Sequence, residues 1–314
     1  MIVDAAETIL VSHLGWVDHS SVWLCETATG EVRSARLSDA QYLSLHAGRD
    51  DWFAAVHHFG GRRLEFSAHR TTAPEQAIAR ISIEDGAVAL EGDSSVWEHL
   101  PRHYTAYCAL PEGKNDYLFV LSGTAPTVEW QSFEWYNNDY DRDYQGILGV
   151  TEIPGQERVI VSIQRDSTPV LHDPNERRAV GKIRLAGRGG NPTLRFRQTA
   201  PELWADDYDT LVRINPKNWS VRNSRRPQTT LLPGTAQFMG AFTFNQDESL
   251  CAVARPFSGD VLALNTRSFR VTHRAAIGRQ PLDVALLSDG QVFARDWKTG
   301  DLLRGELKRR SLFG

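Results

Sequence analysis

The stretch PLDVALLSDGQVFARDWKTGDLLRGEL, residues Pro281–Leu307, contains the pattern that decides the fold. Its three apolar runs are separated by the turn signals Ser288-Asp289-Gly290 and Lys298-Thr299-Gly300. Short apolar runs joined by such turns predict consecutive antiparallel strands with tight hairpins between them. The middle run ends in a polar pair, Arg295 and Asp296.

The same arrangement recurs along the chain. Seven apolar runs end in polar residues: ILVSHL (Ile9–Leu14), FAAVHH (Phe53–His58), FVLSG (Phe119–Gly123), VSIQRD (Val161–Asp166), LWADD (Leu203–Asp207), AVARP (Ala252–Pro256) and VFARD (Val292–Asp296). Their first polar residues are His13, His57, Ser122, Arg165, Asp206, Arg255 and Arg295, which lie 44, 65, 43, 41, 49 and 40 residues apart. A repeat of ~40–50 residues is typical of the four-stranded blade of a β-propeller.

A lone four-stranded sheet cannot bury its own faces, so such sheets must stack against one another around a ring. The sequence therefore predicts an all-β fold: a single seven-bladed β-propeller over residues 1–314, with four-stranded antiparallel blades and both termini paired in one closing blade. The long interval between His57 and Ser122 predicts one blade with a loop insertion around residues 69–103. A six-bladed ring is the alternative if the first run lies outside the repeat.

Residues Pro281–Leu303 contain, in order, a proline, an apolar strand, an Asp-Gly turn, a strand ending in a polar pair and a Thr-Gly turn. This pattern resembles the blades of the YVTN and NHL-like propellers, and Glu202–Val221 and Ser21–Leu37 match it in part. The resemblance implies the propeller fold. Because sensors, scaffolds, lactonases and lyases share the pattern, it implies no single activity.

Composition and charge restrict the partners and the location. The net charge of −4 does not favour nucleic acid, which is bound through concentrated Lys and Arg. No apolar run approaches the ~18 residues of a membrane span, and the acidic N-terminus does not resemble a signal peptide. Three distant cysteines favour a reducing compartment. We expect a soluble cytoplasmic protein that binds a small molecule, a peptide or a protein, without nucleic acid or membrane partners.

The polar ends of the second strands are the predicted site. In a propeller the turns between second and third strands share one face with the links between blades, so these residues would line one mouth. Its predicted ligand-binding residues are His13, Arg165, Arg255, Arg295, Asp296, Trp297, Trp135 and Tyr140. The arginines could converge on a small anion, since guanidinium groups bind carboxylate and phosphate in a bidentate manner. The alternative is that each arginine pairs with a neighbouring aspartate.

A second hypothesis is an enzyme of the lyase or lactone-hydrolase type. Histidine and tyrosine can serve as acid or base, and the candidates for catalysis are His57, His58, His103, Tyr208 and Asp207. The alternative for the His57-His58 pair is structural, with one ring packed and the other solvated. His46 is a further candidate for contact with a ligand.

The segment EWYNNDYDRDYQG, Glu134–Gly146, is the most acidic and aromatic part of the chain. Asp139, Asp141 and Asp143 have the spacing of a calcium loop, but Tyr144 and Val150 occupy the positions of its glycine and its bidentate glutamate. No cofactor is therefore predicted, and Ca²⁺ or Mg²⁺ is the weaker alternative. Trp135, Tyr136, Tyr140 and Tyr144 could instead contact a partner, or the segment could be an ordinary solvated loop.

Overall fold

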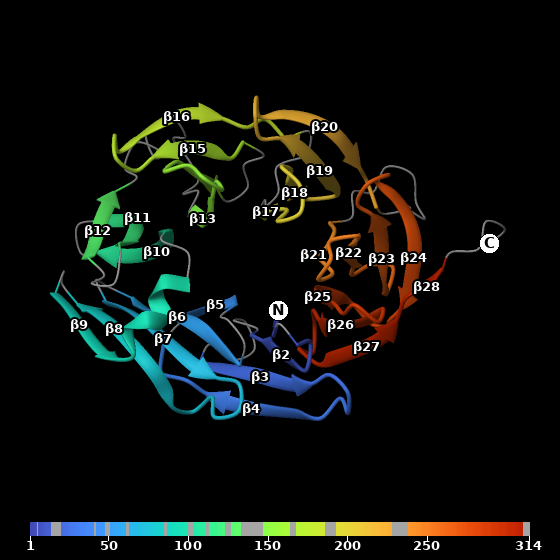
Figure 1. Ribbon diagram of the computed structural model, residues 1–314, viewed down its shortest axis with the longest axis horizontal. Helices are drawn as coiled ribbons and strands as arrows, with labels where there is room; N and C mark the ends of the chain where they lie inside the picture. The colour runs from blue at the N-terminus through green and yellow to red at the C-terminus, as the bar shows by residue number, and fades with distance from the viewer. Residues whose placement is uncertain are drawn as a thin grey trace. The chain divides into compact units, whose positions relative to one another are not determined.

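The computed structural model describes residues 1–4, 6–13, 20–40, 42–47, 51–60, 63–84, 87–99, 103–110, 113–122, 127–132, 147–163, 168–185, 193–227 and 238–309. The chain divides into two compact units, Met1–Ile147 and Leu148–Gly314. Each unit is built from antiparallel sheets whose strands follow one another along the chain (Figure 1).

The first unit contains three sheets in its described residues. The first is β1-β2-β3-β4: Ile2–Val3, Ile9–Ser12, Ser21–Glu26 and Val32–Arg36. The second is β5-β6-β7-β8-β9: Tyr42–Ala47, Trp52–Gly60, Arg63–Arg70, Ala77–Glu84 and Ala87–Gly92. A 3-10 helix, η1 (Ser94–His99), follows it. The third sheet is β10-β11-β12: His103–Leu110, Gly113–Ser122 and Thr127–Ser132.

The described residues of the second unit form four sheets, the first of which begins at Ile147. Two have four strands: β13-β14-β15-β16 (Ile147–Glu152, Val159–Ile163, Val170–Asp173, Arg178–Lys182) and β17-β18-β19-β20 (Leu194–Phe196, Leu203–Asp207, Thr210–Asn215, Ser220–Arg225). The next is β21-β22-β23-β24-β28: Phe242–Phe244, Leu250–Arg255, Asp260–Asn265, Arg270–Ala276 and Lys308–Arg309. The last is β25-β26-β27: Pro281–Leu286, Gln291–Asp296 and Leu302–Glu306.

The repeat predicted from the sequence corresponds to these sheets. Each of the seven apolar runs contributes to the second strand of a different sheet, from β2 for the first run to β26 for the last. The all-β class is confirmed. The hairpin turn at Ser288-Asp289-Gly290 joins β25 to β26, and Gly290 has the positive φ of 88° that favours glycine in such a turn.

Three finer predictions differ from the structure. The described strands nearest the two ends do not share a sheet, because β1 pairs with β2 whereas β28 pairs with β24. Residues 69–103 are not mainly loop, since they include β8, β9 and η1; apolar residues alternate through β8, which lets it extend the sheet. The ring of seven four-stranded blades is not confirmed, because the described sheets have three, four or five strands.

Apolar side chains of successive sheets pack into shared cores in the second unit. Leu171 of β15 and Val212 of β19 belong to one buried cluster, and Trp204 of β18 and Val253 of β22 belong to the next. A third cluster joins Val261 of β23 to Val284 of β25. The two middle sheets of this unit therefore each bury both faces against the sheets before and after them, as the alternation of their strands requires.

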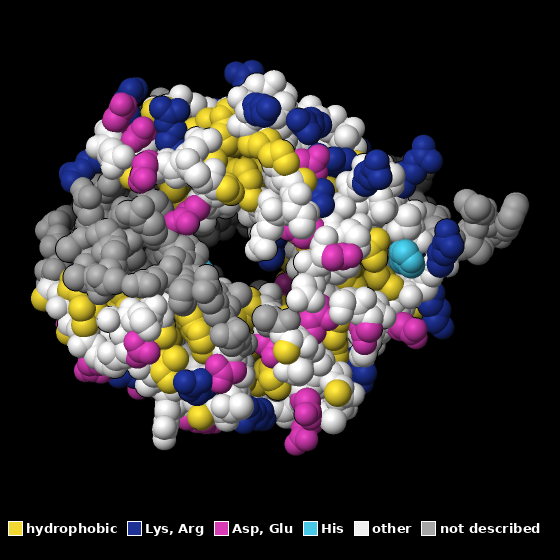
Figure 2. All heavy atoms as spheres, in the orientation of Figure 1, with side chains coloured by type: hydrophobic (Ala, Val, Ile, Leu, Met, Phe, Trp, Pro, Cys, Tyr) yellow, Lys and Arg dark blue, Asp and Glu magenta, His cyan; other side chains and the backbone are white. Residues whose placement is uncertain are grey.

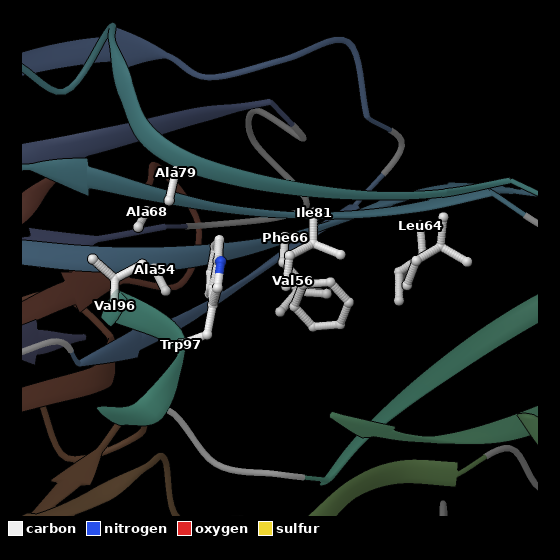
Figure 3. Packing of buried hydrophobic residues seen from close by; sticks show 10 residues of the cluster. Ala54, Val56, Leu64, Phe66, Ala68, Ala79, Ile81, Val96 and Trp97 are labelled. Carbon is white, nitrogen blue, oxygen red and sulfur yellow. The ribbon is translucent and has the colours of Figure 1, made fainter. Parts of the chain in front are cut away.

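The second sheet of the first unit is covered in a different way. Val96 and Trp97 of η1 pack on its apolar face beside Val56 and Phe66 (Figure 3). The 3-10 helix thus shelters strands that carry some of the largest buried side chains of the chain, including Phe66 and Ile81.

In the second unit, the fourth strands are more exposed than the second and third strands. The strands β20 and β24 carry mainly polar residues with exposed or half-buried side chains. Figure 2 shows dark blue Lys and Arg side chains over both strands. These strands form the solvated side of their sheets, whereas the second and third strands are almost wholly buried.

Gly240 is the glycine at which a side chain would be most disruptive for packing between sheets. An added Cβ would lie 2.2 Å from the carbonyl oxygen of Leu282, which accepts the N–H of Ala241. We expect Gly240→Ala to lower the free energy of unfolding by about 1–3 kcal/mol, the usual cost of overpacking. Urea unfolding followed by circular dichroism measures this loss.

Gly149→Ala is the matched control, because nothing lies within 4 Å of the Cβ that it would add. Its unfolding midpoint should stay close to that of the wild type. Equal unfolding midpoints for the two variants would contradict the close approach at Gly240.

Candidate functional site

Four aromatic side chains of the second unit meet at one place. Tyr208, Phe257 and Trp297 each follow the second strand of a different sheet, and Phe238 precedes β21. The ring centroid of Phe238 lies 4.9 Å from that of Trp297, 5.1 Å from that of Phe257 and 6.3 Å from that of Tyr208. We call these four residues the aromatic patch.

The aromatic patch is open to solvent. Tyr208, Phe257 and Trp297 are 37%, 47% and 38% exposed. Among the described residues, the other large hydrophobic side chains with comparable exposure are Val32, Val88 and Leu90, all in the first unit. These three exposed aromatic side chains therefore lie on the turns that follow the second strands of three successive sheets.

Asp296 holds the turn that carries Trp297. Its Oδ1 accepts the backbone N–H groups of Lys298 and Thr299 at 2.9 and 2.8 Å, and its Oδ2 accepts that of Gln280 at 2.9 Å. Burial acts to raise the pKa of Asp296, but these hydrogen bonds outweigh it, so that the pKa is lowered. Asp296 is nearly inaccessible and is engaged in the turn.

Arg255 and Asp260 fix the turn that carries Phe257. The Nε and Nη2 of Arg255 donate to the two carboxylate oxygens of Asp260 at 2.6 and 2.5 Å, and its Nη1 donates to the carbonyl of Pro227 at 3.1 Å. Arg274 also donates to Asp260, which is fully buried. The sequence left two alternatives for the arginines, convergence on a small anion or pairing with a neighbouring aspartate. Arg255 pairs with an aspartate of its own sheet.

The remaining predicted ligand contacts differ in their surroundings. Arg295 is buried in β26, where burial lowers its pKa to about 10 against the opposing charges of Asp283 and Asp301. His13 is half-buried, and its Nδ1 lies 3.0 Å from the carbonyl oxygen of Ser21. Arg165, Trp135 and Tyr140 lie outside the described residues, as does the whole calcium-like segment 134–146.

His57 lies in a buried chain of hydrogen bonds in the first unit. Its Nδ1 contacts the hydroxyl of Ser38 at 2.7 Å and its Nε2 contacts that of Ser67. The Ser67 hydroxyl also lies 2.7 Å from Nε2 of His69. His57 has no exposed surface, which agrees with a packed, structural ring. The side chains of His58 and His103 lie outside the described residues.

The candidate catalytic residues are not gathered within one unit. His57 belongs to the first unit, whereas Asp207 and Tyr208 belong to the second. Asp207 is fully buried, while Tyr208 is exposed and has a positive φ of 57°. The Tyr208 carbonyl accepts the N–H of Met239 at 2.7 Å, which links the patch to the segment before β21.

Two residues of interest were not predicted from the sequence. Phe238 stands in the run AQFMGAF without a turn signal, so its place in the patch could not be recognised. Arg195 stands between Leu194 and Phe196 in β17. The alternation of that strand was the available signal, since it sets the arginine on the opposite face from its two apolar neighbours.

No group of three or more His, Cys, Asp or Glu side chains in the described ranges could hold a metal ion. Within those ranges no helix is both long enough and apolar enough to cross a membrane. The cytoplasmic location stays a prediction.

Comparison with solved structures relates the fold to known proteins. The β-propeller domain of Cps50 (Swd1) from Myceliophteria thermophila matches 98% of this chain and 95% of its own, with a TM-score of 0.63 and 11% identity. The periplasmic gluconolactonase PpgL of Pseudomonas aeruginosa matches 96% and 98%, with a TM-score of 0.58 and 14% identity. Apo AztD of Citrobacter koseri matches 90% and 87%, with a TM-score of 0.52 and 11% identity.

The chain has the β-propeller fold. No model of a protein family matches it, and no curated protein is similar to it, so no YVTN or NHL-like family is shown. At 11–14% identity the solved structures establish the fold of this propeller and leave its activity open.

The buried histidines should make the propeller sensitive to acid. Burial is the main cause that lowers the pKa of His69 to about 4, below the ~6.5 expected in the unfolded chain. The unfolded state therefore takes up a proton at a higher pH than the folded state does. The contribution of His69 to the free energy of unfolding is fully present above pH ~6.5. It is lost as the pH falls toward 4, a total decrease of roughly 3 kcal/mol.

Urea unfolding at pH 7.0 and pH 4.5 tests this expectation. His69→Gln should reduce the dependence of the unfolding free energy on pH, while His46, whose pKa burial also lowers to about 4, retains its own share. His273→Gln on the solvated strand β24 is the control and should leave the dependence unchanged. An identical pH dependence in wild type and His69→Gln would refute the assignment.

Proposed function

We propose that this propeller is a binding module whose aromatic patch receives a short segment of a partner protein. The observation that carries the proposal is the packing of Tyr208, Phe257 and Trp297 around Phe238, with the first three at least a third exposed. Contiguous exposed apolar surface is uncommon away from sites of interaction. Aromatic side chains are also the residues that most often anchor protein interfaces.

The geometry of the rings suits a shaped ligand. Phe238 meets Phe257 and Trp297 at 83° and 85°, and Phe257 meets Trp297 at 77°. These edge-to-face contacts hold the rings in fixed orientations. The turns beneath are fixed in turn by Asp260 and Asp296, so little conformational entropy would be lost when a segment binds.

The charges beside the patch indicate the composition of that segment. Arg226 and Arg274 keep 55% of their side chains exposed, although the carboxylates that they contact, Asp209 and Asp260, are buried. Lys298, next to Trp297, is exposed as well. A partner approaching the patch would thus meet cationic groups, which favours a segment with acidic residues flanking an apolar or aromatic anchor.

The lyase or lactone-hydrolase alternative has less support. The gluconolactonase among the similar structures is related at the level of fold. The best predicted catalytic histidine, His57, is fully buried and hydrogen-bonded to two serines. The proposed site lies within the second unit.

Selection from a displayed library of random peptides tests the proposal. We expect enrichment of peptides that combine acidic residues with an aromatic or leucine anchor. In the double variant Phe257→Ser, Trp297→Ser the affinity for these peptides should fall at least tenfold, as loss of an interface anchor worth about 2 kcal/mol requires. Fluorescence anisotropy with labelled peptides measures the affinities.

The control is the double variant Leu90→Ser, Val88→Ser. These side chains are 47% and 38% exposed, the same fractions as Phe257 and Trp297, and they lie in the first unit. The control should bind as the wild type does. The proposal fails if no peptide is enriched, or if the enriched peptides bind both double variants equally well.

A further inference from the structure

Arg195 occupies an unusual position in the second unit. It lies on β17, and its cross-strand partner on β18 is Trp204. Cross-strand partners lie on the same face of a sheet, and so do residues two apart along a strand. Arg195, Trp204 and Asp206 therefore lie on one face of this sheet. Trp204 packs with Phe242 and Cys251 of the next sheet, so Arg195 and Asp206 are on the face that turns toward that sheet.

The guanidinium of Arg195 has no hydrogen bond and no ion pair among the described residues. Its Nε is buried without a hydrogen-bond partner, and its guanidinium carbon lies 5.9 Å from the centroid of the Phe242 ring. A buried donor without a partner destabilises the folded state, and the effect is larger for a charged group. Such a group in a folded protein usually has a partner that a ligand-free structure does not contain.

Two carboxyl groups lie near Arg195, those of Asp206 and Asp283. The charge of Arg195 acts on Asp206 of β18 and on Asp283 of β25, yet neither forms an ion pair with it. Asp283 is the cross-strand partner of Arg295 on β26. The Oδ1 of Asp206 accepts the backbone N–H of Thr193, which orients this half-buried carboxyl beside the arginine.

We propose that Arg195 and Asp206 together bind a small monocarboxylate. The guanidinium would bind the carboxylate of the ligand through its fork of N–H donors. The carboxyl of Asp206, when protonated, would donate its O–H to the same carboxylate. The guanidinium carries one positive charge, so an anion with a single negative charge matches it better than a doubly charged anion such as phosphate.

Asp206 is suited to this task near neutral pH. Burial raises its pKa to about 7, although the hydrogen bond from Thr193 and the charge of Arg195 both act to lower it. A carboxyl with this pKa is partly protonated at pH 7. Arg195 on β17 is a charged group that acts on Asp206. The site goes beyond the proposed peptide-binding function, because it shares no residue with the aromatic patch.

The test uses the full chain with lactate and benzoate as probes, their neutral amides lactamide and benzamide, and inorganic phosphate. Isothermal titration calorimetry at pH 6 and pH 8 should show binding of at least one carboxylate, about tenfold tighter at pH 6, because a carboxyl of pKa near 7 loses its proton between these values. The amides should not bind, and phosphate should bind more weakly.

Variants assign the two roles. Arg195→Gln should weaken carboxylate binding at least tenfold, and Arg195→Lys, which keeps the charge but loses the fork, tests the same role if the first variant does not fold. Asp206→Asn should bind equally at both pH values, because the amide donates at either one. Arg267→Gln, on an exposed turn, is the control and should bind as the wild type does.

Three results would overturn the inference: no binding of either carboxylate to the wild type, binding unchanged in Arg195→Gln, or tighter binding of phosphate. The double variant Phe257→Ser, Trp297→Ser separates this inference from the proposed function. It should keep carboxylate binding while losing the peptides, so either idea can fail without the other.

Discussion

The packing of one sheet against the next is the constraint on which the rest of this structure depends. Each sheet presents apolar side chains on both faces, and the shared clusters of the second unit show where these faces are buried. Trp204 illustrates the effect: it is fully buried between the rings of Phe244 and Phe269, with centroids 5.2 and 5.1 Å away. Because most strand residues are committed to this packing, the turns provide much of the surface that remains for recognition.

The turns acquire their shape from buried carboxylates. Asp260 and Asp296 satisfy donors from the arginine side chains and from the backbone, and they hold Phe257 and Trp297 at the surface. The polar residues that end the second strands therefore serve mainly as supports, and the aromatic residues after them form the surface that a partner would meet. Arg195 is different, since its charge is left without a close partner in the described part of the chain.

The sequence predicted the strands better than the site. Alternation and turn signals placed the second strands correctly, including VFARD in β26 and LWADD in β18. Pairing between the chain ends is not confirmed among the described residues, where β28 adds to β24, a pairing that no local sequence pattern encodes. His57 was expected among the polar residues that line one face of the propeller. It is instead enclosed by Ser38 and Ser67, which the pairing of neighbouring strands brings beside it.

What the amino-acid sequence by itself determined is the succession of strands and tight turns, because these follow from side-chain alternation and from residues such as Gly290 that local backbone geometry requires. Tertiary structure alone decided which polar side chains are enclosed and which are open. Burial and pairing depend on which residues the fold brings beside a side chain. Arg255 is therefore paired with Asp260 of the adjacent strand, while Arg195 keeps an unpaired guanidinium within the described residues. It also brought Phe238 into contact with Trp297, 59 positions away by number, since apolar surface is sheltered by whichever residues the fold brings beside it.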